Sequence, residues 1–441
     1  MDRRHFLTLM AGAAGLAARP RAAWKAGVAT ADITPALGIW MAGYAARKCP
    51  AEGVALPLHA KVLALEDDRG TRAVLVTLDL LGVTAALRAR IVRAVGTRHG
   101  LRSEALLLNA SHTHSGPVID DMLSIAYDLT PEQPRLIHQY TQELERRVTA
   151  LVGDALRRLR PARLSVGEGG AEFAANRRVE FTPDGPVDHS VPVLRVDSLD
   201  GRPLAIVFGY ACHNTTLQAG SCQLHGDYAG VAQAALERRH PGAAALFVAG
   251  CGGDANPKPR GTLELVERHG GELADAVERT LPSLATVSGP LRAAYAVVDL
   301  PFAPPPGRAE WQARRQASDQ YVRRHAELML EALDRDGRLP AVQAEPVQVW
   351  RFGRDLTLVA LGGEAVVDYA LRLKRDHPSE RLWVAAYSND VFGYVPSRRV
   401  LQEGGYEGGG AMIYYGKPGP FAPEVEELIH GKVRELMGGR L

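Results

Sequence analysis

The sequence predicts a mixed α/β fold in which repeated strand–helix–strand units form sheets flanked by helices. Three observations predict it. First, the segments 73–108, 204–249 and 356–386 each read as a short apolar strand, a helix and a second apolar strand. Second, these strands are apolar throughout, as is typical of strands covered on both faces. Third, polar side chains follow the strand ends, and in α/β sheets ligands bind beyond the C-terminal strand ends, so we expect the active site there.

The three units are defined by apolar runs and helical spacing. The first has strands at 73–80 and 105–108 around a helix at 85–95. The second has strands at 204–211 and 243–249 around a helix at 229–239. The third has strands at 356–361 and 382–386 around a helix at 366–374. We therefore expect each unit to contribute its strand ends to one shared site.

The segments between the units supply supporting elements. A strand and turn are predicted at 26–35, and further strands at 62–66, 164–167, 191–196, 293–300 and 342–351. Further helices are predicted at 131–160, 263–281, 308–333 and 423–437, with irregular loops at 41–57 and 174–178. No low-complexity tract or clean linker interrupts the chain, so we expect residues 24–441 to form a single catalytic domain.

Residues 1–23 read as an export signal rather than as part of the fold. Arg3 and Arg4 precede Phe6 and Leu7, and an uncharged apolar stretch with a small-residue exit follows. This arrangement is typical of twin-arginine signals and predicts a periplasmic or secreted protein. The apolar stretch is too short to span a bilayer, and no later segment is long and uncharged enough, so we expect no transmembrane segment.

Composition narrows the function classes. The 441 residues are 46% hydrophobic and 23% charged, which is ordinary for a soluble globular protein. The net charge of +2, without a basic run in the body of the chain, argues against a nucleic-acid partner. The four cysteines form no C-x-x-C pair, so a structural zinc knuckle is not expected. In an oxidising compartment the chain can form one disulfide. Cys212 and Cys222 are the nearest pair in sequence, but the sequence does not establish the pairing.

The segment 109–117 carries the first chemical signal. His112 and His114 come directly after an apolar strand, and on extended chain residues two apart face the same side. Neutral imidazole is a good zinc ligand and a good general base. The alternative is that nearby loop backbone satisfies both histidines.

Other polar residues follow the strand ends of all three units. They are Asp79, His213, His225, Asp227, Asp254, Asn256, Glu364 and Tyr394. A catalytic zinc site takes three or four nitrogen or oxygen ligands, and His112, His213 and Glu364 are the candidates, with Tyr394 as a fourth ligand or as a hydrogen-bonding pocket residue. Zinc in such a site activates water at neutral pH and polarises a carbonyl. No Gly-x-Ser-x-Gly elbow, Walker loop or dinucleotide fingerprint is present.

These segments resemble the neutral/alkaline non-lysosomal ceramidase family. The residues 109–117 resemble its Thr-His-Thr-His-Ser-Gly-Pro segment, and 210–216 with 226–230 resemble its second histidine segment. Gly363-Glu364 and the tyrosine segments 389–394 and 406–408 resemble three further motifs. The resemblance implies a zinc site made of His112, His213, Glu364 and Tyr394. It also assigns His114 to the substrate or the transition state, and Arg177 to contact with substrate.

Two departures from the family pattern change the expected chemistry. Where the family has a serine in Gly-Asp-x-Ser-Pro, this chain has Asn256. An amide cannot act as a nucleophile, although it can donate a hydrogen bond to an oxyanion. Full-length relatives carry a further C-terminal β-sandwich domain, for which we expect this chain to be too short. We therefore predict a zinc-dependent hydrolase of an amide-type bond, with a small-molecule or ceramide-like lipid substrate.

Two other hypotheses remain open at this point. A non-catalytic binding protein would keep the scaffold and the metal but would have lost the reaction together with the serine. A different metallohydrolase, directed at phosphoesters, would use Asp79, His225 and Asp227 to hold a second metal. The sequence does not define an oligomeric state.

Overall fold

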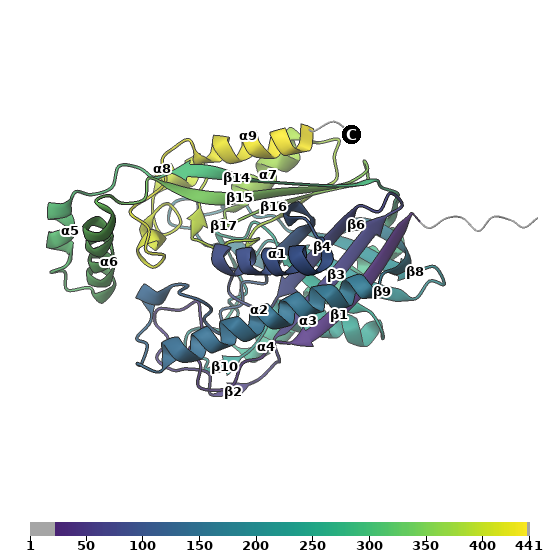
Figure 1. Ribbon diagram of the computed structural model, residues 1–441, viewed down its shortest axis with the longest axis horizontal. Helices are drawn as coiled ribbons and strands as arrows, with labels where there is room; N and C mark the ends of the chain where they lie inside the picture. Colours follow the sequence, from purple (N-terminus) through teal and green to yellow (C-terminus); the bar gives the residue numbers. More distant parts are fainter. Residues whose placement is uncertain (1–22, 439–441) are drawn as a thin grey trace, which may run out of the picture.

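The computed structural model describes residues 23–438, and the proposed export signal lies almost wholly outside them. Two β-sheets pack face to face, and helices cover the outer face of each sheet (Figure 1). The layers are helices, large sheet, small sheet and helices. The mixed α/β fold with sheets flanked by helices is therefore confirmed.

The large sheet has nine strands and is mixed. Its strand order is β11 (Ala244–Ala249), β9 (Pro203–Tyr210), β8 (Ser190–Ser198), β6 (Arg160–Gly170), β1 (Trp24–Asp32), β3 (His59–Asp67), β4 (Arg72–Leu78) and β5 (Leu106–Ala110), with β13 (Ala285–Val287) paired to β6. Two pairs are parallel, β4 with β5 and β9 with β11. The sheet is so strongly curled that its two end strands meet, and Asn109 on β5 accepts a hydrogen bond from the Ala249 amide of β11 at 2.9 Å.

The small sheet has four strands in the order β14 (Leu291–Pro301), β15 (Val342–Phe352), β16 (Leu356–Leu361) and β18 (Leu382–Ala385). The pair β16 and β18 is parallel. All three predicted strand–helix–strand units are thus parallel units, but the third belongs to a different sheet from the first two. Apolar side chains of both sheets, among them Trp24, Trp350 and Trp383, form one core cluster between them.

The helices lie on the outer faces. The large sheet is covered by α1 (Ala85–His99), α2 (Gln133–Arg157), α3 (Asp227–Arg239) and α4 (Leu263–Thr280), and the small sheet by α7 (Val367–Asp376) and α9 (Val425–Gly438). The amphipathic spacing of the helices explains this placement. Leu87, Ile91 and Val95 of α1, for example, are all buried in another large apolar cluster, separate from the one between the two sheets. Among the described residues, no helix has the length and apolar content that crossing a membrane requires.

Short elements surround the carboxyl ends of the parallel strands. They are the two-stranded pairs β2 (Gly53–Val54) with β10 (Gln223–Leu224), β7 (Ala174–Asn176) with β12 (Ala255–Pro257), and β17 (Glu364–Ala365) with β19 (Tyr394–Val395). The remaining pieces are α8 (Arg398–Glu403) and the 3₁₀ turns η1 (Ser103–Ala105), η2 (Ser124–Ala126), η3 (Leu281–Ser283) and η4 (Gly410–Ile413). The sequence predicted none of these short strands, which are held by tertiary pairing rather than by their own patterns.

The prediction of one helix over 308–333 is wrong. The structure has α5 (Arg308–Arg314) and α6 (Gln320–Asp336), which fold back on each other as a helical hairpin inserted between β14 and β15. The break has a local cause, because the carboxylate of Asp319 accepts the amides of Tyr321 and Val322 at 2.7 and 3.1 Å and so begins a new helix.

The disulfide joins Cys49 to Cys222, not the nearest pair in sequence. The parallel pairing of β10 with β2 brings residue 222 beside the segment that carries Cys49. Cys212 instead points into the core at the end of β9, and it is free and buried, as is Cys251.

Candidate metal and active site

Two loops bring three histidines together. His112 and His114 follow β5, His213 follows β9, and the loops run side by side through a bridge between Thr113 and Asn214. His112 adopts φ +63°, a conformation that costs a non-glycine residue about 1 kcal/mol or more and that persists where the surroundings impose it. One imidazole nitrogen of each of the three histidines lies within 4.8 Å of one nitrogen of each of the other two.

Hydrogen bonds set the tautomers of the two predicted histidine ligands. His112 Nδ1 lies 2.7 Å from the Leu81 carbonyl oxygen, and His213 Nδ1 lies 2.7 Å from that of Gly252. Because a carbonyl oxygen only accepts, each Nδ1 carries a proton and donates it. Loop backbone thus satisfies one nitrogen of each ring, and each Nε2 presents a lone pair to the site.

Glu364 and Tyr394 face these nitrogens from the third unit. The parallel pairing of β17 with β19 places the two residues directly opposite each other. Glu364 Oε2 lies 3.0 Å from the Nε2 atoms of both His112 and His213. The Tyr394 hydroxyl lies 3.1 Å from His213 Nε2. The structure therefore brings all four predicted metal ligands into contact.

The donor set fits a metal ion. Glu364 Oε2 is buried and has no hydrogen-bond partner, although two imidazole nitrogens face it at 3.0 Å. With the imidazole protons on Nδ1, no hydrogen lies between these electron-rich atoms, so a cation is the natural partner. Tetrahedral ligands at about 2.0–2.1 Å from zinc would lie about 3.3 Å apart, which is close to the 3.0–3.1 Å separations observed.

The charges of the site agree with this interpretation. Burial, aided by the positive charge of Arg177, lowers the pKa of His213 to about 4. Burial also lowers the pKa of His114 well below its usual value. Burial alone would raise the pKa of Glu364, but in the metal-free protein His112 and His213, when they are protonated, hold it well below the usual range. At neutral pH the site thus offers neutral His213 and His114 imidazoles and one carboxylate.

His114 stands beside the proposed ligands. Its Nε2 lies 3.2 Å from His112 Nε2, and its ring packs against Tyr44 at 4.7 Å. Its Nδ1 is buried without a partner. Close packing holds the ring, because a Cβ on Gly43 would lie 2.4 Å from His114 Nδ1.

Gly43→Ala is therefore expected to displace His114 while sparing the metal. The φ of +101° at Gly43 adds strain, and a misplacement of about 1 Å costs roughly 10²-fold in rate. We expect kcat/KM on an amide substrate to fall by about 10–100-fold, with the metal content unchanged. Gly38→Ala is the matched control, since φ there is +89° and no atom lies within 4 Å of the added Cβ. Equal activity of the two variants would contradict this positioning role.

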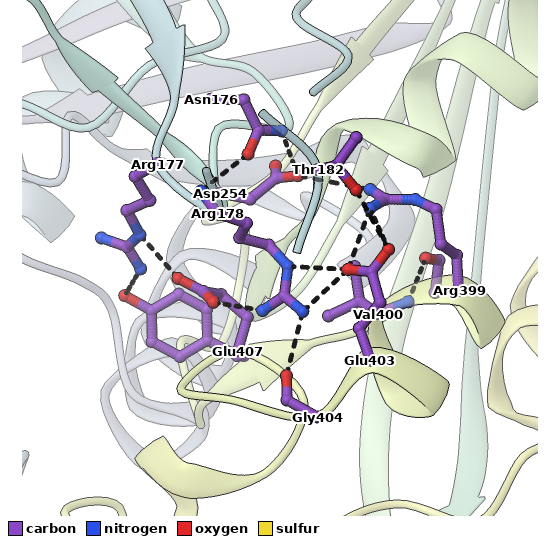
Figure 2. A network of polar contacts seen from close by, with 12 residues as sticks. Asn176, Arg177, Arg178, Thr182, Asp254, Arg399, Val400, Glu403, Gly404 and Glu407 are labelled. Carbon is purple, nitrogen blue, oxygen red and sulfur yellow. Dashed lines mark hydrogen bonds and ion pairs between the residues drawn. The ribbon is translucent and has the colours of Figure 1, made fainter. Parts of the chain in front are cut away.

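Arg177 contacts the site through Tyr394. Its guanidinium donates to the Tyr394 hydroxyl at 2.9 Å and to Glu407 at 2.6 Å. Figure 2 shows the surrounding network, in which the buried Arg178 lies between Glu403 and Glu407. Burial alone would raise the pKa of Glu407, but the two arginines lower it below its usual range. The network therefore fixes the segment after α8 beside the site.

Three residues proposed for a second metal do not join the cluster. Asp79 accepts hydrogen bonds from the His59 amide and from Gln233, and Asp227 accepts the amides of Leu217 and Tyr228. His225 Nδ1 accepts the Asp227 amide. Within residues 23–438 these side chains form no metal-binding group. The alternative hypothesis of a two-metal phosphoester site therefore receives no support from this region, where neighbouring amide groups occupy the three side chains.

Asp254 and Asn256 flank Ala255, whose carbonyl accepts a hydrogen bond from the His213 amide at 3.0 Å. Asp254 accepts the Val367 amide at the start of α7 and a hydrogen bond from Asn176, and burial raises its pKa to about 6. Asn256 Oδ1 accepts a hydrogen bond from Thr215 at 3.2 Å. Neither residue lines the pocket beside the cluster.

Sequence reasoning missed two residues of the site. Tyr415 donates a hydrogen bond to Glu364 Oε1 and so orients the carboxylate, and Glu407 orients Arg177. Both lie in the glycine-rich stretch 404–416. Glycine-rich loops that carry aromatic residues are a signal for a binding loop, but this pattern does not identify which tyrosine faces a ligand.

The fold and the cluster define a class, namely an α/β protein whose strand ends hold a buried histidine–carboxylate site suited to a metal ion. The chain belongs to the neutral/alkaline non-lysosomal ceramidase family, because the model of that family's N-terminal region matches residues 24–263. The resemblance noted in the sequence is therefore confirmed.

Known proteins agree with this assignment. The neutral ceramidase of Drosophila pseudoobscura pseudoobscura is 24% identical over 278 residues, which are 58% of this chain and 39% of that protein. Neutral ceramidase B of Dictyostelium discoideum is 26% identical over 264 residues, 54% of this chain and 36% of that protein. The crystal structure of neutral ceramidase from Pseudomonas aeruginosa shares the fold with a TM-score of 0.75 at 19% identity, covering 94% of this chain and 74% of that one. The match thus spans less than two fifths of the two curated relatives.

Proposed function

We propose that this protein hydrolyses an amide-type bond at a zinc site held by His112, His213, Glu364 and Tyr394. The observation that carries the proposal is the meeting of two imidazole lone pairs and an unpartnered carboxylate oxygen, at 3.0 Å, without a hydrogen between them. Family membership supports the amide-type bond, of the kind found in ceramide-like N-acyl lipids.

Each nearby side chain has a distinct part in the proposed reaction. Zinc, when bound, supplies Lewis-acid polarisation of the carbonyl and activation of water. His114 lines the pocket with a neutral imidazole, so it can accept a proton and return it to the leaving amine. Arg177 holds the Tyr394 oxygen toward His213 by a hydrogen bond of 2.9 Å, and its charge favours negative charge on nearby oxygens.

Asn256 replaces the family serine and keeps a role in orientation. Its hydrogen bond with Thr215, two residues after His213, ties it to the histidine loop. An amide forms no covalent acyl intermediate, so the proposed route needs no nucleophilic side chain at this position.

We further infer that residues 24–441 act as one catalytic unit in an oxidising compartment. The large sheet supplies the histidines, while Glu364 follows β16 of the small sheet, so neither sheet forms the site alone. The Cys49–Cys222 disulfide supports a periplasmic or secreted location, in agreement with the twin-arginine signal proposed from residues 1–23.

Removal of the metal tests the proposed function. We expect about one zinc per chain by elemental analysis, complete loss of amide hydrolysis after dialysis against a chelator, and recovery on adding back one equivalent of zinc. The substrate panel should contain N-acyl amides, with phosphate esters as the control class. Zinc retained without turnover of any amide would favour the binding-protein alternative, and a folded protein without metal would contradict the zinc site.

A further inference from the structure

The two oxygens of the Glu364 carboxylate have different surroundings. Oε2 lies 3.0 Å from the Nε2 atoms of both His112 and His213, and it has no hydrogen-bond partner among the described residues. Oε1 instead accepts a hydrogen bond from the Tyr415 hydroxyl. The Glu364 side chain is only 2% exposed, so the protein rather than bulk water sets the rotation of the carboxylate. One oxygen is thus presented to the proposed metal position, and the other is bound by Tyr415.

The loop that carries Tyr415 is anchored where it leaves α8. The buried Arg178 lies between the carboxylates of Glu403 and Glu407, and its guanidinium also donates to the Gly404 carbonyl at 2.9 Å (Figure 2). These contacts hold the start of the loop through groups other than the proposed metal ligands.

The ring of Tyr415 packs beside the strand β19. Its centroid lies 6.4 Å from that of Tyr394, at an interplanar angle of 81°. A Cβ on Gly393 would lie 3.6 Å from Tyr415 Cγ, which is an ordinary contact distance. The Gly393 carbonyl in turn accepts the Glu364 amide at 2.8 Å. Because the ring is packed against this backbone, the Tyr415 hydroxyl has little freedom to follow a rotating carboxylate.

A pocket opens beside the proposed metal position. Its lining includes His112, His114, Glu364, Tyr394 and Tyr415, so water or a substrate carbonyl would reach the metal from this side. A catalytic zinc site keeps such a position open beside its protein ligands. A second oxygen from Glu364 would compete with water or substrate for that position.

We propose that Tyr415 is a positioning residue that restricts Glu364 to binding the metal through Oε2 alone, so that one metal position stays open to the pocket. The hydrogen bond to Oε1 satisfies the second oxygen and opposes the rotation that would bring it to the metal. This inference rests on the proposed metal site and adds to it the residue that sets how the carboxylate binds.

Tyr415→Phe removes the hydroxyl and keeps the ring. We expect zinc affinity, measured by competition with a chelator, to fall by about 10–100-fold, because the freed carboxylate must be ordered again when the metal binds. Tyr414→Phe is the matched control. Tyr414 lines the same pocket, but its ring packs against Tyr321 and Tyr406, so the loss of its hydroxyl should leave zinc affinity unchanged.

Cobalt(II) in place of zinc reports the number of ligands, since its visible absorption weakens as the coordination number rises. In Tyr415→Phe the freed Oε1 can join Oε2 on the metal. At saturating cobalt we therefore expect weaker absorption for Tyr415→Phe than for the wild type or Tyr414→Phe. A general loss of stability would weaken metal binding without adding a ligand, so the spectrum separates positioning from a merely structural role.

The outcomes distinguish this inference from the proposed metal site. Wild-type protein that binds neither zinc nor cobalt would overturn the site itself. If the wild type binds both metals and Tyr415→Phe matches it in zinc affinity and cobalt spectrum, the role of Tyr415 is overturned and the site is left intact. Weaker zinc binding with an unchanged cobalt spectrum would also overturn the one-oxygen restriction, because the hydroxyl would then only support the fold.

Discussion

Replacing His213 by alanine is expected to abolish metal binding and to lower kcat/KM on amide substrates by about 10³-fold or more, because metal polarisation supplies several kcal/mol of transition-state stabilisation. His213 is fully buried, its Nδ1 donates to the Gly252 carbonyl, and its Nε2 lies 3.0 Å from Glu364 and 3.1 Å from Tyr394.

Elemental analysis of purified wild-type and variant protein is the measurement. His269→Ala is the matched control, because His269 is an equally buried histidine that bonds to the Pro259 carbonyl, outside the cluster. Both variants lose a buried ring, so any general loss of stability should be comparable. One zinc in the His269 variant and none in the His213 variant would support the site. Equal zinc content in the two variants would refute it.

Replacing Glu364 by glutamine is expected to remove the metal and the activity, yet to stabilise the metal-free protein. In the metal-free wild type, Glu364 Oε2 faces two lone pairs without a partner. The glutamine amide can donate to these nitrogens, while its oxygen still accepts the hydrogen bond from Tyr415. Satisfying a buried polar atom is worth about 1–3 kcal/mol. A neutral amide nitrogen does not bind zinc, so metal affinity should be lost.

The measurement is the melting temperature of wild type and variant, each with and without zinc. We expect the metal-free variant to melt at a higher temperature than the metal-free wild type, by about 2–4 °C for each kcal/mol gained. Zinc should stabilise the wild type only. Glu345→Gln is the control, because Glu345 is also fully buried but bonds to the Gly362 amide rather than to the histidines. Stabilisation of both variants by zinc would contradict the assignment of Glu364 as a ligand.

Much of the site could be predicted because its residues follow strands that local pattern defines. His112, His114, His213 and Glu364 each come directly after a buried apolar strand, and the structure gathers all four. The alternative, that loop backbone satisfies both His112 and His114, holds for one nitrogen only: His112 Nδ1 bonds to the Leu81 carbonyl, whereas His114 Nδ1 is buried without a partner.

Other features could not be read from pattern. Tyr415, Glu407 and the Cys49–Cys222 bond depend on loops that meet only after the sheets have formed. The break before α6 depends on the capping of one turn by Asp319, which competes with an otherwise continuous helical spacing.

The sequence by itself determined the class of fold, the three strand–helix–strand units, the family and the residue types of the site, because hydrophobic periodicity and short motifs are local properties of the chain. Only the tertiary structure decided how the units meet. The large sheet curls until β5 and β11 touch through Asn109, and β18 of the small sheet closes against both, where the Ala386 amide bonds to the Ala249 carbonyl and its carbonyl accepts from Asn109. Sheet curling arises from the sum of strand twists and from packing between layers, and no local pattern encodes that sum. The contact of α6 with the segment that follows β1 is decided in the same way, since the Tyr321 hydroxyl donates to the Ala45 carbonyl, 276 residues away in the chain.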